Sequence, residues 1–65
     1  MALVERADSE GLTTLTLNRP EALNALSPAL FGELRAHIDQ LAGETDTVGC
    51  VILCGAGRSF SAGND

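Results

Sequence analysis

Apolar and polar residues alternate along two short segments near the start of the chain. Residues 3–7 alternate loosely, whereas residues 12–17 alternate well between leucine and threonine. Alternation with a period of two predicts β-strands. The polar segment 8–11 between them contains a glycine and is typical of the connection in an antiparallel hairpin. Pro20 ends the second strand, because proline has no N–H to donate to a neighbouring strand.

The next pattern predicts an amphipathic helix with a defined beginning and end. Ser27 supplies a side-chain oxygen suited to an N-cap, and Pro28 suits the first helical position. Gly43 stands where a left-handed C-cap would end the helix. The helix is expected to bury an apolar face with a period of 3.6 residues. That face consists of Leu30, Leu34, Ile38 and Leu41.

Residues 48–54 are apolar on both faces, which is typical of a parallel strand that is covered on each side. A strand, a helix and a buried strand form a βαβ unit, so the fold class is α/β. One helix and one hairpin cannot cover both faces of this last strand. We therefore expect further chain or other subunits to supply the cover, and residues 1–65 to be one domain that is cut short.

The composition excludes two of the usual reinforcements of a small domain, a disulfide framework and a zinc site, and leaves oligomerisation open. A chain of 65 residues buries about 60% of the surface that its unfolded form exposes. Cys50 and Cys54 are four residues apart on one strand, so their Cα atoms lie about 13 Å apart, too far for a disulfide. With one histidine, a zinc site cannot be assembled either. The cysteines are expected to be small buried apolar residues, and free thiols favour the cytoplasm.

The charge argues against nucleic acid and anionic membranes as partners. Nine acidic residues against four basic ones give a formal charge of −5, and the chain has no lysine. The longest apolar stretch, near residues 48–53, is too short to span a bilayer. The start of the chain carries charges where a secretory signal needs apolar residues, so no targeting segment is expected.

A glycine-rich segment, residues 55–63, follows the last strand. A dinucleotide-binding fingerprint would need glycine at the sixth position of this pattern, where Phe60 stands, and a Walker A loop would need lysine. Two interpretations remain open on the residues alone. The backbone amides of the turn could face a developing oxyanion, or the glycines could simply turn the chain.

Two blocks carry a resemblance to a known family. The first is Asn-Arg-Pro-x-Ala-x-Asn-Ala at residues 18–25, and the second is Phe-x-Ala-Gly-x-Asp at residues 60–65. In this order and spacing they resemble the enoyl-CoA hydratase/isomerase (crotonase) family over nearly the whole chain. The resemblance implies a crotonase-like superhelix of ββα units. The first β-hairpin, the helix and the buried strand of that fold are present in this amino-terminal fragment.

The resemblance also implies a reaction. An acyl-CoA thioester is bound, backbone N–H groups polarise its carbonyl, and an enolate-like intermediate is stabilised. By position, the first oxyanion donor is the N–H of Asn64. The second donor and the acid/base carboxylates would lie beyond Asp65, so the 65 residues alone are not expected to be active, and hydratase (lyase) and isomerase chemistry both stay open. Coenzyme A is part of the substrate, and no separate cofactor or metal is expected.

Contacts to coenzyme A are implied at two segments. Glu21 and Leu23 stand where many family members carry a basic or polar side chain, which puts a charged grip on the phosphates in doubt. Small and apolar residues here could instead pack the entrance of the helix. The expected contact residues are Glu21, Ala22, Leu23, Ala25, Ser61, Ala62, Gly63, Asn64 and Asp65.

Three other residues favour structural roles. Arg19 is expected to form an ion pair or hydrogen bond, Asp65 to cap the next helix, and His37 to be a partly exposed helix residue. The resemblance further implies fatty acid metabolism and a homotrimer or hexamer. A different class of function also stays open. In that alternative the chain is a non-catalytic, truncated module or remnant that acts in protein interaction.

Overall fold

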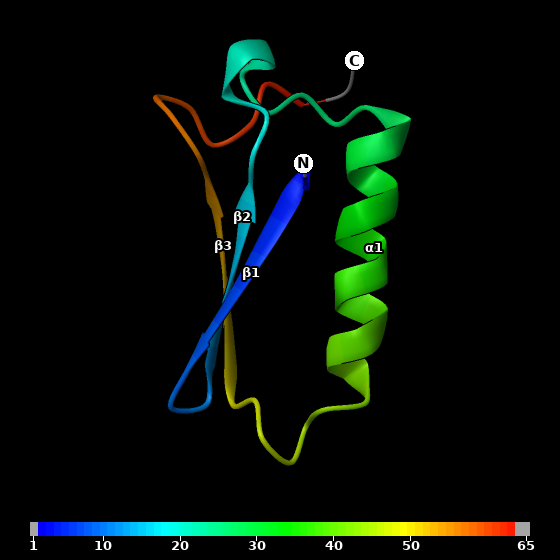
Figure 1. Ribbon diagram of the computed structural model, residues 1–65, viewed down its shortest axis with the longest axis vertical. Helices are drawn as coiled ribbons and strands as arrows, with labels where there is room; N and C mark the ends of the chain where they lie inside the picture. Colours follow the sequence, from blue (N-terminus) through cyan, green and yellow to red (C-terminus); the bar gives the residue numbers. More distant parts are fainter. Residues whose placement is uncertain (1, 64–65) are drawn as a thin grey trace.

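The computed structural model describes residues 2–63 and contains three strands and one long helix. The strands are β1 (Val4–Ser9), β2 (Leu12–Leu17) and β3 (Cys50–Gly55). A short 3-10 helix, η1 (Pro20–Ala22), follows β2, and α1 (Pro28–Ala42) connects it to β3 (Figure 1). This order of elements is the predicted hairpin followed by a βαβ unit.

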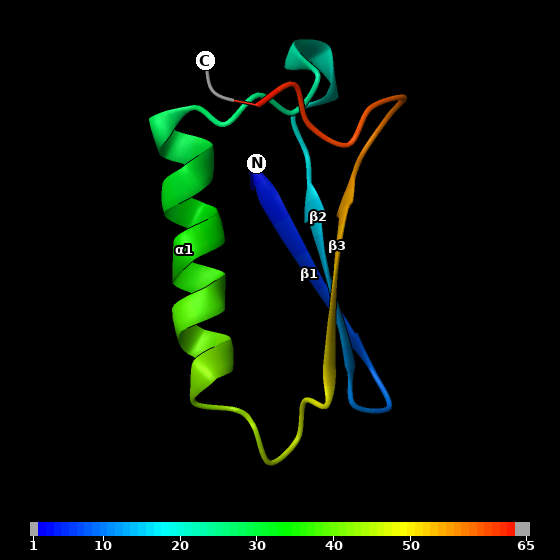
Figure 2. The same ribbon diagram turned by 180° about the vertical axis from the view of Figure 1, so that it is seen from behind.

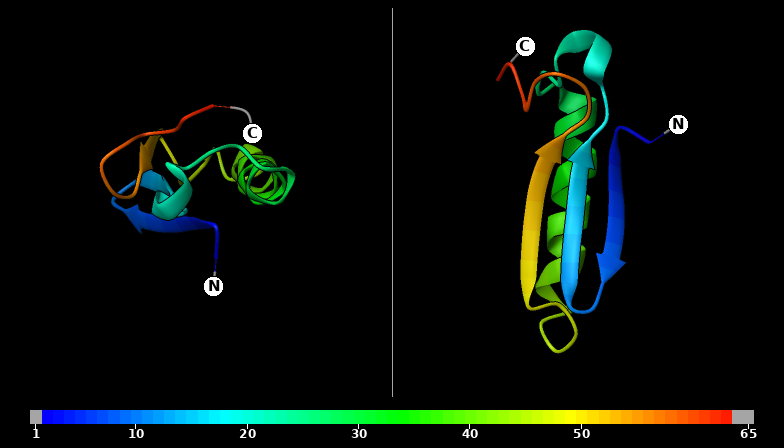
Figure 3. Two further views of the ribbon diagram at one scale, coloured as in Figure 1. Left: turned by 90° about the horizontal axis from the view of Figure 1, so that it is seen from above. Right: turned by 90° about the vertical axis from the view of Figure 1, so that its left-hand side faces the viewer.

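The strands form one sheet in the order β1-β2-β3 (Figure 3). β1 pairs antiparallel with β2, and β2 pairs parallel with β3, so the α/β class is confirmed. The hairpin turn is shorter than predicted, because Ser9 already pairs with Leu12. Its two central residues, Glu10 and Gly11, have φ values of 50° and 81°. Positive φ at both central positions is the geometry of the two-residue turns that match the twist of paired strands.

α1 covers one face of the sheet, and the core lies between them (Figures 1 and 2). The inner face of β2 packs there against three leucines of α1. The carboxylate of Glu33 adds a polar contact between α1 and the start of β1. Glu33 on α1 accepts hydrogen bonds from the backbone N–H groups of Leu3 and Val4 through one oxygen, at 2.9 and 3.2 Å. The buried apolar cluster comprises Val4, Leu15, Leu17, Leu30, Leu34 and Leu41.

The start of α1 follows the prediction and its end does not. Ser27 is the N-cap, and its hydroxyl accepts a hydrogen bond from the N–H of Leu30 at 3.2 Å. The left-handed C-cap predicted at Gly43 is wrong, since this residue has φ −91° and ψ 1°. Its N–H bonds to the carbonyl of Gln40 at 3.1 Å, and the N–H of Glu44 bonds to that of Leu41 at 2.9 Å. The helix therefore ends in a tightened right-handed turn.

The predicted inner face of α1 is wrong at one position. Ile38 is 51% exposed, although its spacing from Leu34 suits the buried face. The inner face instead runs through Leu34, His37 and Leu41, with His37 half-buried as expected. A three-stranded sheet is narrow, so it covers one side of the helix and leaves Ile38 at the flank.

β3 begins and ends later than predicted, and it is exposed. The N–H groups of Gly49 and Cys50 both bond to the carbonyl of Gly11. Gly49 therefore belongs to the connection between α1 and β3, and the strand begins at Cys50. The cover expected on both faces of this strand is absent from residues 2–63 (Figure 3). Val51 and Leu53 point to one face and Ile52 to the other, and all three are exposed. Cys50 is consequently exposed, contrary to the expectation, Cys54 is half-buried, and both thiols are free. The exposed apolar residues are Val51, Ile52 and Leu53.

Candidate functional site

Two loops meet at one end of the sheet. The first loop (residues 18–27) follows β2, and the second loop (residues 56–63) follows β3. Because β2 and β3 are parallel, their carboxyl ends lie at the same edge, and α1 begins at this end as well (Figure 1). Ligands of α/β proteins usually bind beside the carboxyl ends of parallel strands. The two loops therefore form the candidate site.

The first loop contains a tight turn in an uncommon backbone conformation. Leu23 and Asn24 are consecutive left-handed residues, with φ values of 53° and 54°. A left-handed leucine costs about 1–3 kcal/mol and persists where surrounding contacts hold it. Hydrogen bonds from the N–H of Leu23 to the carbonyl of Pro20 (3.1 Å) and from that of Asn24 to the carbonyl of Arg19 (2.9 Å) close the turn.

Asn24 connects the first loop to the second. Its side chain is fully buried, and its amide oxygen accepts a hydrogen bond from the N–H of Arg19 at 2.7 Å. Its amide nitrogen donates to the carbonyls of Ala56 and Ser59, each at 2.9 Å. Both N–H donors of the amide are thereby used, which a buried polar group requires if it is not to destabilise the fold.

Backbone hydrogen bonds join the loops further along. The N–H of Ala62 donates to the carbonyl of Leu23 at 2.9 Å, and the N–H of Leu26 donates to the carbonyl of Gly63 at 2.8 Å. The Ser61 hydroxyl donates to the carbonyl of Asn24 at 2.8 Å and accepts from the N–H of Gly63 at 3.1 Å. The second loop thus lies along the first and is held by side-chain and main-chain bonds.

Glycine is required where the second loop folds back on β3. A Cβ atom at Gly55 would lie 2.6 Å from the carbonyl oxygen of Ser59 and closer still to that of Phe60. Gly57 has φ +83°, and a Cβ atom there would lie 2.9 Å from the Cβ of Pro20. A larger residue would collide with main chain at Gly55, and at Gly57 it would meet the Pro20 side chain in a left-handed backbone conformation.

An open apolar cavity of about 350 Å³ lies beside the second loop. Leu53 and Phe60, which form part of its wall, are 43% and 53% exposed. The second loop contributes Phe60, Ser61 and Gly63 to this wall. The cavity is lined by Leu17, Leu26, Leu34, Leu53, Phe60, Ser61 and Gly63.

Residues 12–65, which contain both loops, match the model of the family described as enoyl-CoA hydratase/isomerase. This chain belongs to that family. The first block that suggested the family lies within the first loop, and the described part of the second block, residues 60–63, lies within the second loop.

Curated members of the enoyl-CoA hydratase/isomerase family align with most of the chain. The 1,2-epoxyphenylacetyl-CoA isomerase of Escherichia coli (strain K12) is 45% identical over 56 residues, covering 86% of this chain and 21% of the relative. A probable enoyl-CoA hydratase of Rhodobacter capsulatus is 44% identical over 57 residues, covering 88% and 21%. The chain therefore spans about a fifth of the length of these relatives, one named as an isomerase and one as a hydratase.

Solved structures of the family share the fold. A monofunctional enoyl-CoA isomerase from Mycobacterium smegmatis superposes with a TM-score of 0.91 at 36% identity, over 97% of this chain and 30% of that one. An enoyl-CoA hydratase from Mycobacterium tuberculosis H37Rv gives 0.87 at 41% identity, over 97% and 27%. The crotonase-like fold expected from the resemblance is confirmed for the part of the fold that this chain spans.

The structure brings the predicted site residues within residues 2–63 to the two facing loops. Glu21 and Ala62 are exposed, and Ala25 is buried in the packing beside the helix entrance. Ala22, Leu23, Ser61 and Gly63 are half-buried. Asn64 and Asp65, including the expected oxyanion donor, lie outside the described residues.

Sequence reasoning missed Asn24 as a residue of this site, and it gave the Ser61 side chain no internal role. One signal was present, because asparagine is a polar residue suited to left-handed turns and here stands between Leu23 and Ala25. Its partners Ala56 and Ser59 are more than thirty residues away along the chain. Arg19 forms an ion pair with Glu21 at 3.9 Å, in keeping with its expected structural role.

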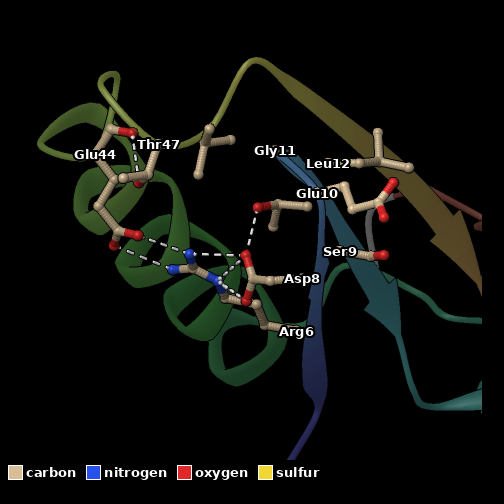
Figure 4. A pocket seen from close by; sticks show the side chains of 10 residues that line it. Arg6, Asp8, Ser9, Glu10, Gly11, Leu12, Glu44 and Thr47 are labelled. Atoms are coloured by element: carbon tan, nitrogen blue, oxygen red, sulfur yellow. Dashed lines mark hydrogen bonds and ion pairs between the residues drawn. The ribbon is translucent and has the colours of Figure 1, made fainter.

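A second, polar cavity of about 280 Å³ lies at the opposite end of the sheet (Figure 4). The Arg6 guanidinium lies between two carboxylates there, with Nη2 at 2.7 Å from Oε1 of Glu44 and Nε at 3.0 Å from Oδ2 of Asp8. Thr13 donates a further hydrogen bond to Asp8 at 2.6 Å. These partners tie β1 to the connection after α1, so this cluster is structural.

Hydrogen bonding to Arg6 lowers the pKa of Asp8, with Thr13 contributing, and also lowers the pKa of Glu44. A carboxylate with a lowered pKa stabilises the fold above its unfolded pKa, and this stability is lost as the pH falls through the folded pKa. The unfolded pKa values are about 3.9 and 4.3, so we expect resistance to urea to be constant near neutrality and to fall below about pH 4. Urea titrations across this pH range measure the effect.

The matched variant is Arg6→Met, which keeps the unbranched stem and removes the charge. Its unfolding midpoint is expected to be lower near pH 7 and to change less between neutral and acid pH. If the unfolding midpoint of the variant falls below about pH 4 as steeply as that of the parent protein, Arg6 is not the cause of the acid sensitivity.

Across residues 2–63, no three His, Cys, Asp or Glu side chains are grouped so that they could hold a metal ion. The same part of the chain has no helix with the length and apolar character needed to cross a membrane.

Proposed function

We propose that this chain forms the first part of an acyl-CoA site in an enzyme of the enoyl-CoA hydratase/isomerase type. In this proposal the first loop contacts coenzyme A through Glu21, Ala22, Leu23 and Ala25, and the second loop contacts it through residues 61–65. The N–H of Asn64 donates to the thioester oxygen. The single observation that carries the proposal is that hydrogen bonds join the two loops into one backbone surface beside an apolar cavity.

The placement of the donor at residue 64 is supported by how the neighbouring amides are used. The N–H of Ala62 bonds to Leu23, and the N–H of Gly63 bonds to Ser61. Neither amide is left to face a substrate. The next N–H along the chain belongs to Asn64, the residue that the family resemblance selects.

The carbonyl of Gly63 supports the same donor. It accepts from the N–H of Leu26 at 2.8 Å, so it faces the entrance of α1. In a planar, trans peptide bond the N–H points opposite to the carbonyl. The hydrogen bond at the Gly63 carbonyl therefore constrains the peptide group that carries the proposed donor.

A backbone donor suits the chemistry of a thioester enolate. As the carbon next to the carbonyl loses a proton, negative charge collects on the carbonyl oxygen, and a fixed N–H dipole stabilises it without having to reorient. The apolar surface of Leu26, Leu53 and Phe60 next to the loop lowers the local dielectric and strengthens this interaction.

Coenzyme A is expected to meet main chain and not charged side chains of the first loop. Glu21 carries the same sign of charge as the phosphates, and it is already close to Arg19. Ala22 and Leu23 present small and apolar side chains, which allow a pantetheine arm to approach the backbone. No cofactor besides the coenzyme A of the substrate belongs to this proposal.

The enzyme is proposed to work in fatty acid metabolism in the cytoplasm, and to assemble as a homotrimer or hexamer. β3 exposes apolar side chains on both faces, Val51 and Leu53 on one and Ile52 on the other, and further protein is expected to cover them. The remainder of a domain about five times as long, as in the relatives, is large enough to provide this cover.

Turnover of acyl-CoA thioesters by the complete enzyme tests the proposal. Crotonyl-CoA reports hydration through loss of the conjugated enoyl absorbance, and 3-enoyl-CoA reports double-bond migration through its gain. We expect turnover of at least one, and much weaker turnover of the same acyl groups on N-acetylcysteamine, which lacks the nucleotide part. If calorimetry detects no binding of either CoA thioester and neither is turned over, the non-catalytic module becomes the better account.

A further inference from the structure

Asn24 and Ser61 form a continuous chain of hydrogen bonds that ends on the backbone of Gly63. We propose that both are positioning residues, which hold the peptide before the oxyanion donor in the geometry that polarises the thioester. The inference rests on the proposed function, because it assigns how the proposed donor is kept in place. Neither side chain is required to touch the substrate.

The chain begins with the buried amide of Asn24. Its oxygen is fixed by Arg19, and its nitrogen is fixed by the carbonyls of Ala56 and Ser59. These three bonds hold residue 24 in the left-handed conformation and join the beginnings of both loops. The backbone carbonyl of Asn24 is thereby held toward Ser61.

The Ser61 hydroxyl passes this constraint to Gly63. A carbonyl oxygen can only accept, so the single hydroxyl proton must go to Asn24, at 2.8 Å. The hydroxyl oxygen is then an acceptor for the N–H of Gly63, at 3.1 Å. The direction of both hydrogen bonds is therefore determined by the chemistry of the three groups.

Gly63 is held from both sides as a result. Its N–H is bound by Ser61 and its carbonyl by Leu26, and its φ of +91° is accessible mainly to glycine. The carbonyl and the next N–H share one rigid plane, so fixing the carbonyl orients the donor. A shift of about 1 Å in a catalytic group can lower a rate about 100-fold.

The decisive experiment compares Ser61→Ala with the parent in the complete enzyme. The hydroxyl bonds to Asn24 and Gly63 are lost, while the backbone bonds of Ala62 and Gly63 to the first loop remain. We expect kcat for the acyl-CoA substrate to fall between about tenfold and about 100-fold with KM little changed. The carbonyl stretching frequency of a bound, unreactive acyl-CoA, measured by Raman difference spectroscopy, should move back toward its value in water.

Two serine variants make the comparison specific. Ser61→Thr keeps the hydroxyl and is expected to recover most of kcat and the carbonyl shift. Ser59→Ala is the matched control, because the hydrogen bond from Asn24 uses the backbone carbonyl of residue 59, which alanine retains. Parent values of kcat and of the carbonyl frequency in Ser61→Ala would overturn the proposal, as would equal losses in Ser61→Ala and Ser59→Ala.

Asn24→Asp tests the other end of the chain. Aspartate keeps the acceptor for Arg19 but removes both donors to Ala56 and Ser59 and sets a carboxylate against their carbonyls. We expect a loss of kcat larger than that of Ser61→Ala, and a folded variant with parent kcat would remove Asn24 from the proposal. If the variant does not fold, the Ser61 series decides. Asn64→Pro distinguishes failure of the proposed function from failure of this inference. Turnover that survives Asn64→Pro refutes the proposed donor. Turnover that is lost in Asn64→Pro but normal in Ser61→Ala refutes only the positioning role.

Discussion

Replacing Asn64 by proline in the complete enzyme is expected to lower kcat by about 100-fold to 1,000-fold. Proline has no N–H, and removing one oxyanion donor typically has an effect of this size. The donor interacts most strongly with the charge that develops in the transition state, so KM for the acyl-CoA substrate should change little. Steady-state kinetics with the best substrate of the turnover assay give both constants.

Asn64→Ala is the matched control, since it deletes the side chain and keeps the amide. It should retain most of the activity of the parent. Comparable losses in the alanine and proline variants would assign the effect to the side chain. Comparable activity of the proline variant and the parent would place the donor elsewhere in the loop.

Gly55→Ala is expected to disrupt the second loop through the addition of one methyl group. The new Cβ would collide with the carbonyls of Ser59 and Phe60, which are main-chain atoms and cannot rotate away. Overpacking of this kind destabilises by about 1–3 kcal/mol, and the loop must also move relative to β3. We therefore expect a lower melting temperature together with a kcat at least tenfold below that of the parent.

Gly32→Ala provides a control with the same chemical change and the opposite expected effect on the melting temperature. Gly32 lies within α1, and a Cβ atom there would meet no other atom within 4 Å. Alanine in an exposed helix interior is favoured over glycine by about 1 kcal/mol, so this variant should melt at a higher temperature with unchanged kcat. Thermal unfolding of both variants, followed by circular dichroism, makes the comparison. A normal loop and normal kcat in Gly55→Ala would contradict the close approach described for the second loop.

Local patterns were sufficient to predict the three strands and α1 of this fold, but not the short helix η1. The alternation in residues 12–17 reproduces β2, and Ser27 and Pro28 mark the start of α1 correctly. These features depend on neighbours within four residues, where periodicity and capping chemistry act directly. The hairpin and the parallel pairing of β2 with β3 then follow from the order of the elements.

The errors arise where a partner outside the local segment decides the outcome. Ile38 has the spacing of a buried residue, but the narrow sheet leaves it at the flank and places His37 nearer the core. Gly43 is a residue that permits a left-handed cap, and the hydrogen bonds of the last turn make one unnecessary. Helical period and residue type give the possibilities, and the packing surface selects among them.

In the candidate site, too, local features could be predicted from the sequence and contacts between distant residues could not. The resemblance pointed to both loops, and a glycine-rich turn after a buried strand is visible in the sequence. The bonds of Asn24 to Ala56 and Ser59, and of Ser61 to Asn24, join residues that are more than thirty positions apart. No periodic pattern reports such contacts, because they depend on how the two loops are brought together in space.

The exposed strand β3 has a consequence for how the chain folds. As the outer member of the sheet within residues 2–63, it presents backbone N–H and C=O groups that β2 does not pair. Residues 50–54 carry no charge and no proline, and they are rich in β-branched and apolar side chains. Such a segment is a template for aggregation until it is covered. Until the strand is covered, chaperone binding to it is expected to control the yield of folded protein.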